Sequence, residues 1–219
     1  MKVLFIGNSY TNVNDMPEIF KDIVLSSKKE IEVCKITRNG AALDGFSNPD
    51  TMSGRKVYLE LSKGYDFCFL QEQSNRPVVG KEKFYEAVKK LNDDLAKNNT
   101  KLVLYETWTK ANGHHDLVKY KLNSETMHEK LVQSYEELGD MISCKVSKVG
   151  RVFYYIYTHP ELKMNPYSTD LSHPSVLGSY IIALTHYYTL FNTLDDVSYY
   201  YIFNKDILDK IKEIIIKAV

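Results

Sequence analysis

Short apolar runs alternate with longer helix-like segments along the whole of this 219-residue chain. The runs that predict strands are residues 3–6, 31–37, 66–70, 102–105 and 145–147. Apolar residues recur at helical spacing in 16–27, 51–63, 80–97, 124–140, 150–157, 174–191 and 204–219. Strands separated by helices predict βαβ units with a mostly parallel sheet. The expected fold is a three-layer α/β/α sandwich of about five strands.

Two helix starts are predicted from capping signals. A capping box is expected to begin at Ser124, and Pro174 is expected in the first turn of the helix that it opens. We find no internal repeat, low-complexity tract or linker, so residues 1–219 are expected to form one domain.

Charge and cysteine content narrow the class of protein. Lysine plus arginine equals aspartate plus glutamate, at 28 each, which argues against a partner recognised mainly by charge, such as nucleic acid or a membrane surface. No apolar run has the length of a membrane span or of a signal peptide, so a cytoplasmic location is expected. Cys34, Cys68 and Cys144 are scattered and form no Cys-x-x-Cys pair, which indicates reduced thiols. No metal or organic cofactor is expected, and the oligomeric state stays open.

Polar or glycine-bearing segments follow the first three predicted strands. In a parallel sheet the ligand site lies outside the carboxyl ends of the strands. Residues 7–11, 38–42 and 71–74 occupy that place, and residues 170–174 immediately precede a long apolar helix. These four segments are therefore expected to meet at one edge of the sheet.

The residues of these segments suit acyl transfer by a serine nucleophile. A serine hydroxyl needs a base to remove its proton, and the base needs a third group to fix its tautomer. Ser9 is the candidate nucleophile, His173 the base and Asp170 the orienting acid. The candidate oxyanion donors are the backbone N–H groups of Ser9 and Gly40 and the side-chain amide of Gln73 or Gln71.

Three of these segments resemble blocks of the SGNH (GDSL-type) hydrolases. Residues 5–11, Phe-Ile-Gly-Asn-Ser-Tyr-Thr, look like the first block, in the variant with asparagine before the nucleophile. Asn39-Gly40-Ala41 is similar to the second block, whose glycine donates an N–H group. Asp170 and His173 match the last block, Asp-x-x-His. The resemblance implies a flavodoxin-like SGNH hydrolase fold and a Ser9-His173-Asp170 triad.

The third block departs from the usual Gly-x-Asn-Asp pattern of the family. This chain has Gln71-Glu72-Gln73-Ser74 there, and register sets Gln73 against the asparagine whose amide serves the oxyanion hole. The resemblance implies a serine esterase. No long apolar surface or lid is evident in the sequence, and the tyrosines and Trp108 suit a sugar, so a small acyl ester, first of all an acetyl ester on a carbohydrate, is the preferred substrate. Lysophospholipase, thioesterase or acyltransferase activity are the alternatives, as is a catalytically silent binding protein of the same fold.

Several further residues have two interpretations. Trp108 follows the fourth predicted strand and either lines an acyl or sugar pocket or packs beneath a loop. His114, His115 and Asp116 have the composition of a metal cluster, but adjacent side chains are expected to diverge, so a loop bordering the site is preferred. Glu72 is expected to support its loop rather than to act as a second catalytic carboxylate.

Overall fold

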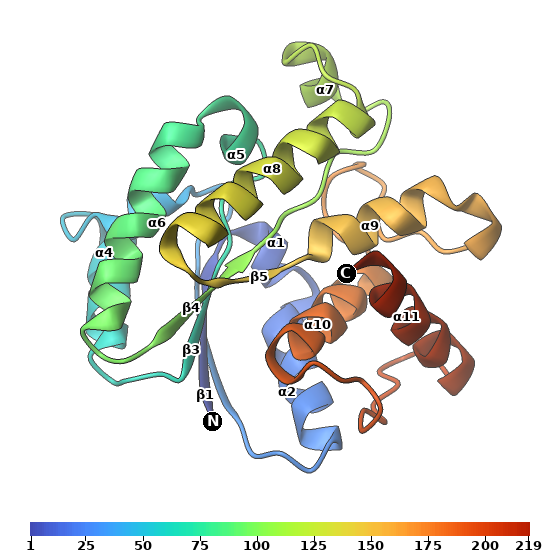
Figure 1. Ribbon diagram of the computed structural model, residues 1–219, viewed down its shortest axis with the longest axis horizontal. Helices are drawn as coiled ribbons and strands as arrows, with labels where there is room; N and C mark the ends of the chain where they lie inside the picture. Colours follow the sequence, from blue (N-terminus) through green and yellow to red (C-terminus); the bar gives the residue numbers. More distant parts are fainter.

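The computed structural model, which describes residues 1–219, has a five-stranded parallel sheet at its centre (Figure 1). The strands are β1 (Lys2–Gly7), β2 (Glu32–Thr37), β3 (Phe67–Leu70), β4 (Lys101–Tyr105) and β5 (Lys145–Ser147). All five predicted strands are thus confirmed. Their spatial order is β2-β1-β3-β4-β5, and every neighbouring pair is parallel. From β1 the chain first forms β2 on one side and then forms β3 on the other side of β1. The junction between β1 and β3 is therefore the switch point at which such sheets bind ligands.

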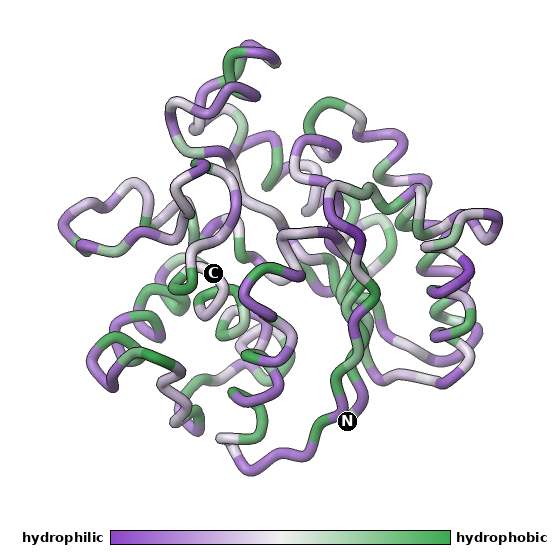
Figure 2. The backbone as a smooth tube through the Cα atoms, turned by 180° about the vertical axis from the view of Figure 1, so that it is seen from behind, coloured by the Kyte–Doolittle hydropathy of each residue, from purple (hydrophilic) through white to green (hydrophobic).

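Helices cover both faces of the sheet, as predicted (Figure 1). One face carries α2 (Met16–Ser26), α9 (Val149–Thr158), α10 (Val176–Phe191) and α11 (Lys205–Ala218); the other carries α3 (Leu43–Ser47), α4 (Met52–Leu61), α6 (Lys81–Ala96) and α8 (Ser124–Ile142). Successive residues of a strand point to opposite faces. Val3 and Phe5 therefore enter one core cluster, and Leu4 and Ile6 enter the other. Figure 2 shows the resulting pattern, with apolar strands at the centre.

Short helices that the periodicity did not predict begin just beyond the strands. They are α1 (Ser9–Asn12), α3, α5 (Arg76–Val79) and α7 (His115–Lys119), together with the 3-10 turn Val13–Asp15; a further 3-10 turn, Pro160–Leu162, follows helix α9. Segments of three to five residues are too short to display a helical repeat in sequence. These pieces position the polar residues at the carboxyl ends of the strands.

The predicted start of α8 at Ser124 is confirmed, but its predicted cap is wrong by one residue, and α10 begins two residues later than predicted. The capping box of α8 is formed by Asn123 and Thr126, because the Asn123 side chain accepts from the Thr126 N–H at 2.7 Å and the Thr126 hydroxyl faces the Asn123 N–H at 3.1 Å. Helix α10 is capped by Ser175, so Pro174 lies before the helix, in an antiparallel bridge with Tyr167. That bridge shapes the loop that carries Asp170 and His173.

The three cysteines are unpaired; Cys68 is buried, and Cys34 and Cys144 are half-buried. None of the helices combines the length and the apolar character that crossing a membrane requires.

Candidate active site

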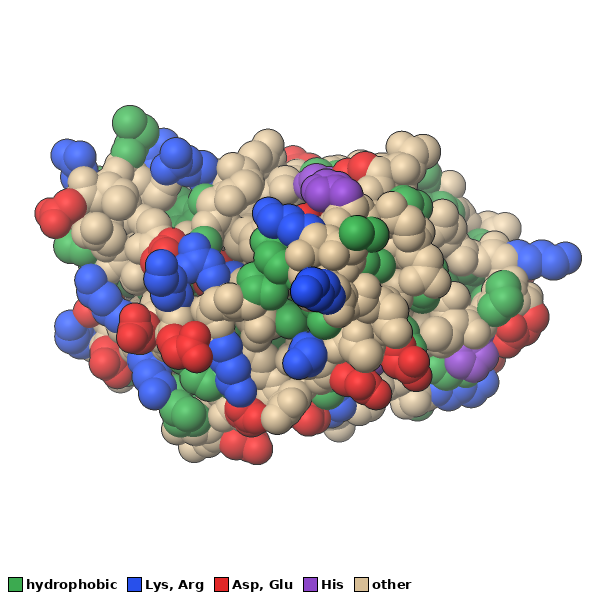
Figure 3. Space-filling view, turned by 90° about the horizontal axis from the view of Figure 1, so that it is seen from above, with side chains coloured by type: hydrophobic (Ala, Val, Ile, Leu, Met, Phe, Trp, Pro, Cys, Tyr) green, Lys and Arg blue, Asp and Glu red, His purple; other side chains and the backbone are tan.

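Segments from the carboxyl ends of the strands surround an open pocket of about 190 Å³. Figure 3 looks down on this end of the molecule, where histidine lies at the surface beside both basic and acidic side chains. The pocket is lined by Asn8, Ser9, Tyr10, Gly40, Gln73, Ser74, Lys110, His114, His115, Asp116, Ser172 and His173. The segments after β1, β2 and β3 and the segment 170–174 therefore meet, as the sequence predicts.

Ser9 lies on a tight strand-to-helix turn that its neighbour Asn8 organises. The Asn8 side chain accepts from the Tyr10 N–H at 3.1 Å, which caps α1, and donates to the Ala41 carbonyl at 2.9 Å. Gly7 is needed here because a Cβ at that position would lie 2.5 Å from Gln71 Oε1. The turn is thereby tied to two other loops, and Ser9 stays partly exposed at its tip.

Asp170 fixes the loop that presents His173. Its Oδ1 accepts from the backbone N–H groups of Ser172 (3.0 Å) and His173 (2.9 Å), and its Oδ2 lies 2.5 Å from His173 Nδ1. Burial opposes ionisation, but the hydrogen bonds from the His173 side chain and these backbone groups lower the pKa of Asp170 to about 2. The carboxylate is therefore ionised at neutral pH.

Ser9, His173 and Asp170 form one continuous hydrogen-bonded chain. Ser9 Oγ lies 2.8 Å from His173 Nε2, while the opposite ring nitrogen faces the Asp170 carboxylate. An ionised carboxylate can only accept, so the proton of a neutral His173 is on Nδ1 and Nε2 is free to accept from the serine hydroxyl. This is the arrangement by which a histidine can withdraw a proton from a nucleophile.

Two residues that line the pocket have backbone N–H groups without an acceptor in the chain. Ser9 is the first residue of α1, so its N–H has no acceptor within the helix. The Gly40 N–H makes no hydrogen bond with the rest of the chain. Gly40 has φ +72°, and a Cβ added at this position would meet no atom within 4 Å. Its left-handed backbone, rather than close packing, is therefore what favours glycine there.

The two glutamine candidates occupy different environments. Gln73 borders the pocket, and its Oε1 accepts from the N–H groups of Asn75 (2.9 Å) and Arg76 (3.1 Å), which leaves the amide nitrogen as the free end. Gln71 is buried beneath the turn that carries Ser9, where its Oε1 accepts from the Asn8 N–H at 2.8 Å and its Nε2 donates to the Glu72 carbonyl. Gln71 therefore supports the turn and does not line the pocket.

Glu72 links the loops that carry Gly40 and Gln73. Its Oε1 accepts from the backbone N–H groups of Leu43 (3.0 Å) and Gln73 (2.6 Å), and its buried Oε2 has no partner. Burial raises the pKa of Glu72 to about 7, against the opposing effect of these two hydrogen bonds. The prediction that it supports its loop agrees with these contacts.

Trp108 packs beneath the pocket rather than lining it, which corrects the pocket-lining interpretation. Its side chain is fully buried and stacks between the rings of Tyr10 (4.3 Å between centroids) and Phe153 (4.2 Å). Its indole N–H donates to the Ser172 carbonyl at 2.9 Å. Sequence position alone could not separate the two interpretations, because both require an aromatic residue just beyond β4.

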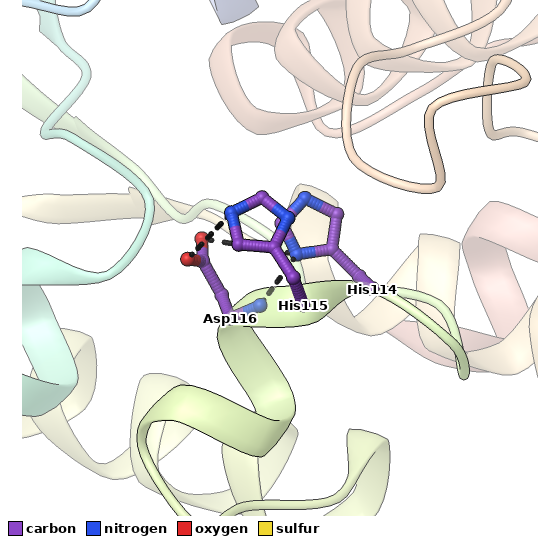
Figure 4. Close-up of side chains that lie close together, drawn as sticks. All are labelled: His114, His115 and Asp116. Atoms are coloured by element: carbon purple, nitrogen blue, oxygen red, sulfur yellow. Dashed lines mark hydrogen bonds and ion pairs between the residues drawn. The ribbon is translucent and has the colours of Figure 1, made fainter.

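The side chains of His114, His115 and Asp116 converge at the start of α7, so the expectation that they diverge is wrong (Figure 4). The two rings stack at 4.3 Å, and one ligand atom from each residue lies within 4.8 Å of the others. His114 Nδ1 accepts from the Asp116 N–H at 3.1 Å and caps the helix, which places a neutral ring's proton on Nε2. The group forms part of the pocket wall.

A second cavity, of about 200 Å³, lies at the opposite edge of the sheet, among the first residues of β3, β4 and β5. It is lined by no histidine and no carboxylate, so it offers no pair of such groups for acid–base chemistry.

Solved structures share this fold. A protein from Slackia heliotrinireducens assigned to the SGNH hydrolases has a TM-score of 0.75 and 25% identity, over 87% of this chain and 98% of that chain. A DUF4886 family protein from Bacteroides uniformis has a TM-score of 0.77 and 16% identity, over 100% of this chain and 94% of that chain. An acetylxylan esterase from Geobacillus stearothermophilus has a TM-score of 0.61 and 12% identity, over 88% and 95% of the two chains.

No protein-family model matches the sequence, and no curated protein matches it either. The assignment to a superfamily therefore rests on the likeness to the Slackia heliotrinireducens protein, and the sheet order β2-β1-β3-β4-β5 agrees with it. The chain belongs to the SGNH (GDSL-type) hydrolase superfamily.

Proposed function

We propose that the protein is a serine esterase that removes a small acyl group, first of all acetyl, from a carbohydrate ester. The nucleophile is Ser9, the general base His173 and the orienting acid Asp170. The observation that carries the proposal is the continuous chain from Ser9 Oγ to His173 Nε2 (2.8 Å) and from His173 Nδ1 to Asp170 Oδ2 (2.5 Å), at the wall of an open pocket.

The reaction has two halves that use the same three groups. His173 Nε2 takes the Ser9 proton as Oγ bonds to the ester carbonyl carbon, and then returns that proton to the leaving alcohol as the ester C–O bond breaks. Water next attacks the acyl-enzyme, giving its proton to His173, which passes it to Ser9 Oγ as the acid departs. Asp170 stays ionised and holds the ring in the required tautomer throughout, consistent with its low pKa.

Three donors are suited to the oxyanion that forms in each half: the N–H groups of Ser9 and Gly40 and the amide of Gln73. The free Gly40 N–H and the fixed orientation of the Gln73 amide support this assignment. Loss of one such donor typically costs about 3–4 kcal/mol of transition-state stabilisation.

The size and lining of the pocket favour a small acyl group on a polar substrate. Its volume of about 190 Å³ is below the roughly 300 Å³ at which pockets for drug-sized ligands begin. Tyr10 is the one hydrophobic residue among the twelve that line it, so a long acyl chain would find little apolar surface. Acetylxylan esterases among the structural neighbours act on acetylated carbohydrate, which agrees with this choice.

The test is hydrolysis of p-nitrophenyl acetate, butyrate and octanoate and of acetylated xylan by the wild type, Ser9→Ala and His173→Ala. Both substitutions are expected to reduce kcat by roughly 10⁴-fold or more, with acetate preferred over octanoate. Ser62→Ala and His159→Ala are the matched controls, since Ser62 is exposed and His159 stacks on Tyr155 away from the pocket. Labelling by a serine-reactive phosphonate should require Ser9.

Each alternative has its own outcome in this experiment. Octanoate preferred over acetate would favour a lysophospholipase or thioesterase, and product formed on an added alcohol in place of free acid would favour an acyltransferase. Neither hydrolysis nor labelling by a folded wild type would contradict the esterase and favour a binding protein.

A further inference from the structure

Lys110 is a buried lysine whose partners are all hydroxyl groups. Only 3% of the residue is exposed, and its Nζ donates to Tyr10 OH (2.6 Å), Ser74 Oγ (2.9 Å) and Ser172 Oγ (2.5 Å). It takes part in none of the ion pairs of the molecule. Burying an unpaired cation is costly, so its placement calls for a reason beyond folding.

The three hydroxyl groups come from three different segments of the site. Each belongs to a residue adjacent in sequence to a residue of the proposed machinery. The adjacent pairs are Ser9 with Tyr10, Gln73 with Ser74, and His173 with Ser172. One amino group thus joins the nucleophile turn, the oxyanion loop and the base loop.

The partners of Lys110 also contact one another and their neighbours, which restricts the movement of the three segments. Tyr10 OH and Ser172 Oγ lie 2.7 Å apart, so two of the three partners also bond to each other. The Tyr10 ring stacks on Trp108 and meets the His173 ring edge-on at 5.4 Å, so the position of Tyr10 bears on the base directly. A shift of Lys110 would therefore reach His173 through a single intervening side chain, that of Tyr10.

We propose that Lys110 is a positioning residue that holds Ser9, Gln73 and His173 in register for acyl transfer. The inference rests on the proposed esterase function. An ammonium has three N–H donors, and all three are occupied, so Lys110 has none left for a substrate group. Its effect is expected on the chemical step and not on substrate affinity.

The primary experiment compares Lys110→Met with Lys29→Met. Lys29 is the matched control, because its Nζ also has three partners (Ser27, Tyr187 and Asp196) but lies away from the pocket. Lys110→Met should reduce kcat and the rate constant of phosphonate labelling roughly 10²-fold, the effect of a misplacement near 1 Å, with KM within about threefold of wild type. Lys29→Met should change neither kcat nor labelling by more than about twofold.

A second measurement separates the amino group from the volume it fills. Lys110 borders the open pocket, so a small amine can enter the space left in Lys110→Ala. Ethylammonium should restore kcat of Lys110→Ala at least about tenfold, and ethanol at equal concentration should not, because only the amine supplies charged donors. If Lys110→Ala does not fold, Tyr10→Phe, which removes one of the three hydroxyls but keeps the stacked ring, should still lower kcat with little change in KM.

The outcomes separate this inference from the function on which it rests. An active wild type whose folded Lys110→Met variant keeps kcat and labelling within about twofold would overturn the inference alone. A rise in KM at constant kcat would overturn it in favour of a substrate contact. A wild type that neither hydrolyses esters nor takes the phosphonate would overturn the esterase function and this inference with it.

Discussion

Two regions of this protein bury polar groups in different ways. The polar layer just beyond the strands holds Asn8, Gln71, Glu72, Ser74, Lys110 and Ser172. Below it, the aromatic cluster of Phe5, Phe20, Phe69 and Tyr105 surrounds His186, with ring centroids 4.4–6.4 Å from the imidazole. In the layer, directional hydrogen bonds tie one loop to another; in the cluster, His186 keeps one bond, from Nδ1 to Ser147 Oγ at 2.7 Å, and is otherwise packed.

The comparison separates what positions the site from what stabilises the fold. Hydrogen bonds depend on angle and distance, so the polar layer can hold Ser9, Gln73 and His173 in a defined arrangement. Packing depends mainly on volume and buried area, so the aromatic cluster contributes stability with little control of direction. Each region also buries one titratable group, and burial favours the neutral form of both. It raises the pKa of Glu72 to about 7 and lowers the pKa of His186 to about 3.

The largest effect on stability is expected from Phe69→Ala. Phe69 is fully buried and stacks on Phe5 at 4.9 Å, so the substitution should reduce the free energy of unfolding by about 3–5 kcal/mol. The kcat per phosphonate-titrated site should stay within about twofold of wild type. Urea unfolding and active-site titration measure the two quantities, with the partly exposed Phe67→Ala as control. A fall in kcat well beyond twofold would contradict this prediction, because it would show that the aromatic cluster also positions the site.

The next effect is the pH dependence that His186 confers on stability. Its folded pKa of about 3 lies below the unfolded value of about 6.5, so its contribution is complete above pH 6.5 and is lost as pH falls. Between pH 6.5 and 4, wild type should lose about 3 kcal/mol more unfolding free energy than the non-titrating His186→Gln. Urea unfolding at several pH values measures the difference, with His159→Gln as control. Equal slopes for wild type and His186→Gln would contradict the prediction.

The smallest effect is the opposite pH dependence that Glu72 confers. Its folded pKa of about 7 lies above the unfolded value of about 4.3, so its contribution is present below about pH 4.3 and is lost as pH rises through 7. Relative to wild type, Glu72→Gln should gain about 2 kcal/mol of unfolding free energy between pH 5 and 7.5. The same urea titrations measure it, with the exposed Glu161→Gln as control. If Glu72→Gln instead gained unfolding free energy relative to wild type as the pH fell, Glu72 would be ionised in the folded protein at pH 5.

Much of the site could be predicted from sequence because its parts are local. Asp170 and His173 are three residues apart on one loop, and Ser9 directly follows a strand, so the edge rule for parallel sheets brings them together. Lys110 was not singled out, although it follows β4 at the same edge. A lone lysine beyond a strand is usually a solvated side chain, and no pattern in the sequence distinguishes one that is buried.

The sequence by itself determined the alternation of strands and helices, the five strands and the segments that gather at their carboxyl ends, because period and chain order are local properties. Only the tertiary structure decided which glutamine faces the pocket, that Trp108 lies beneath it, that His114, His115 and Asp116 converge, and that Lys110 meets three hydroxyl groups. Each of these depends on which way a side chain turns among residues that are distant in the chain, and packing and hydrogen bonding across the fold settle that direction.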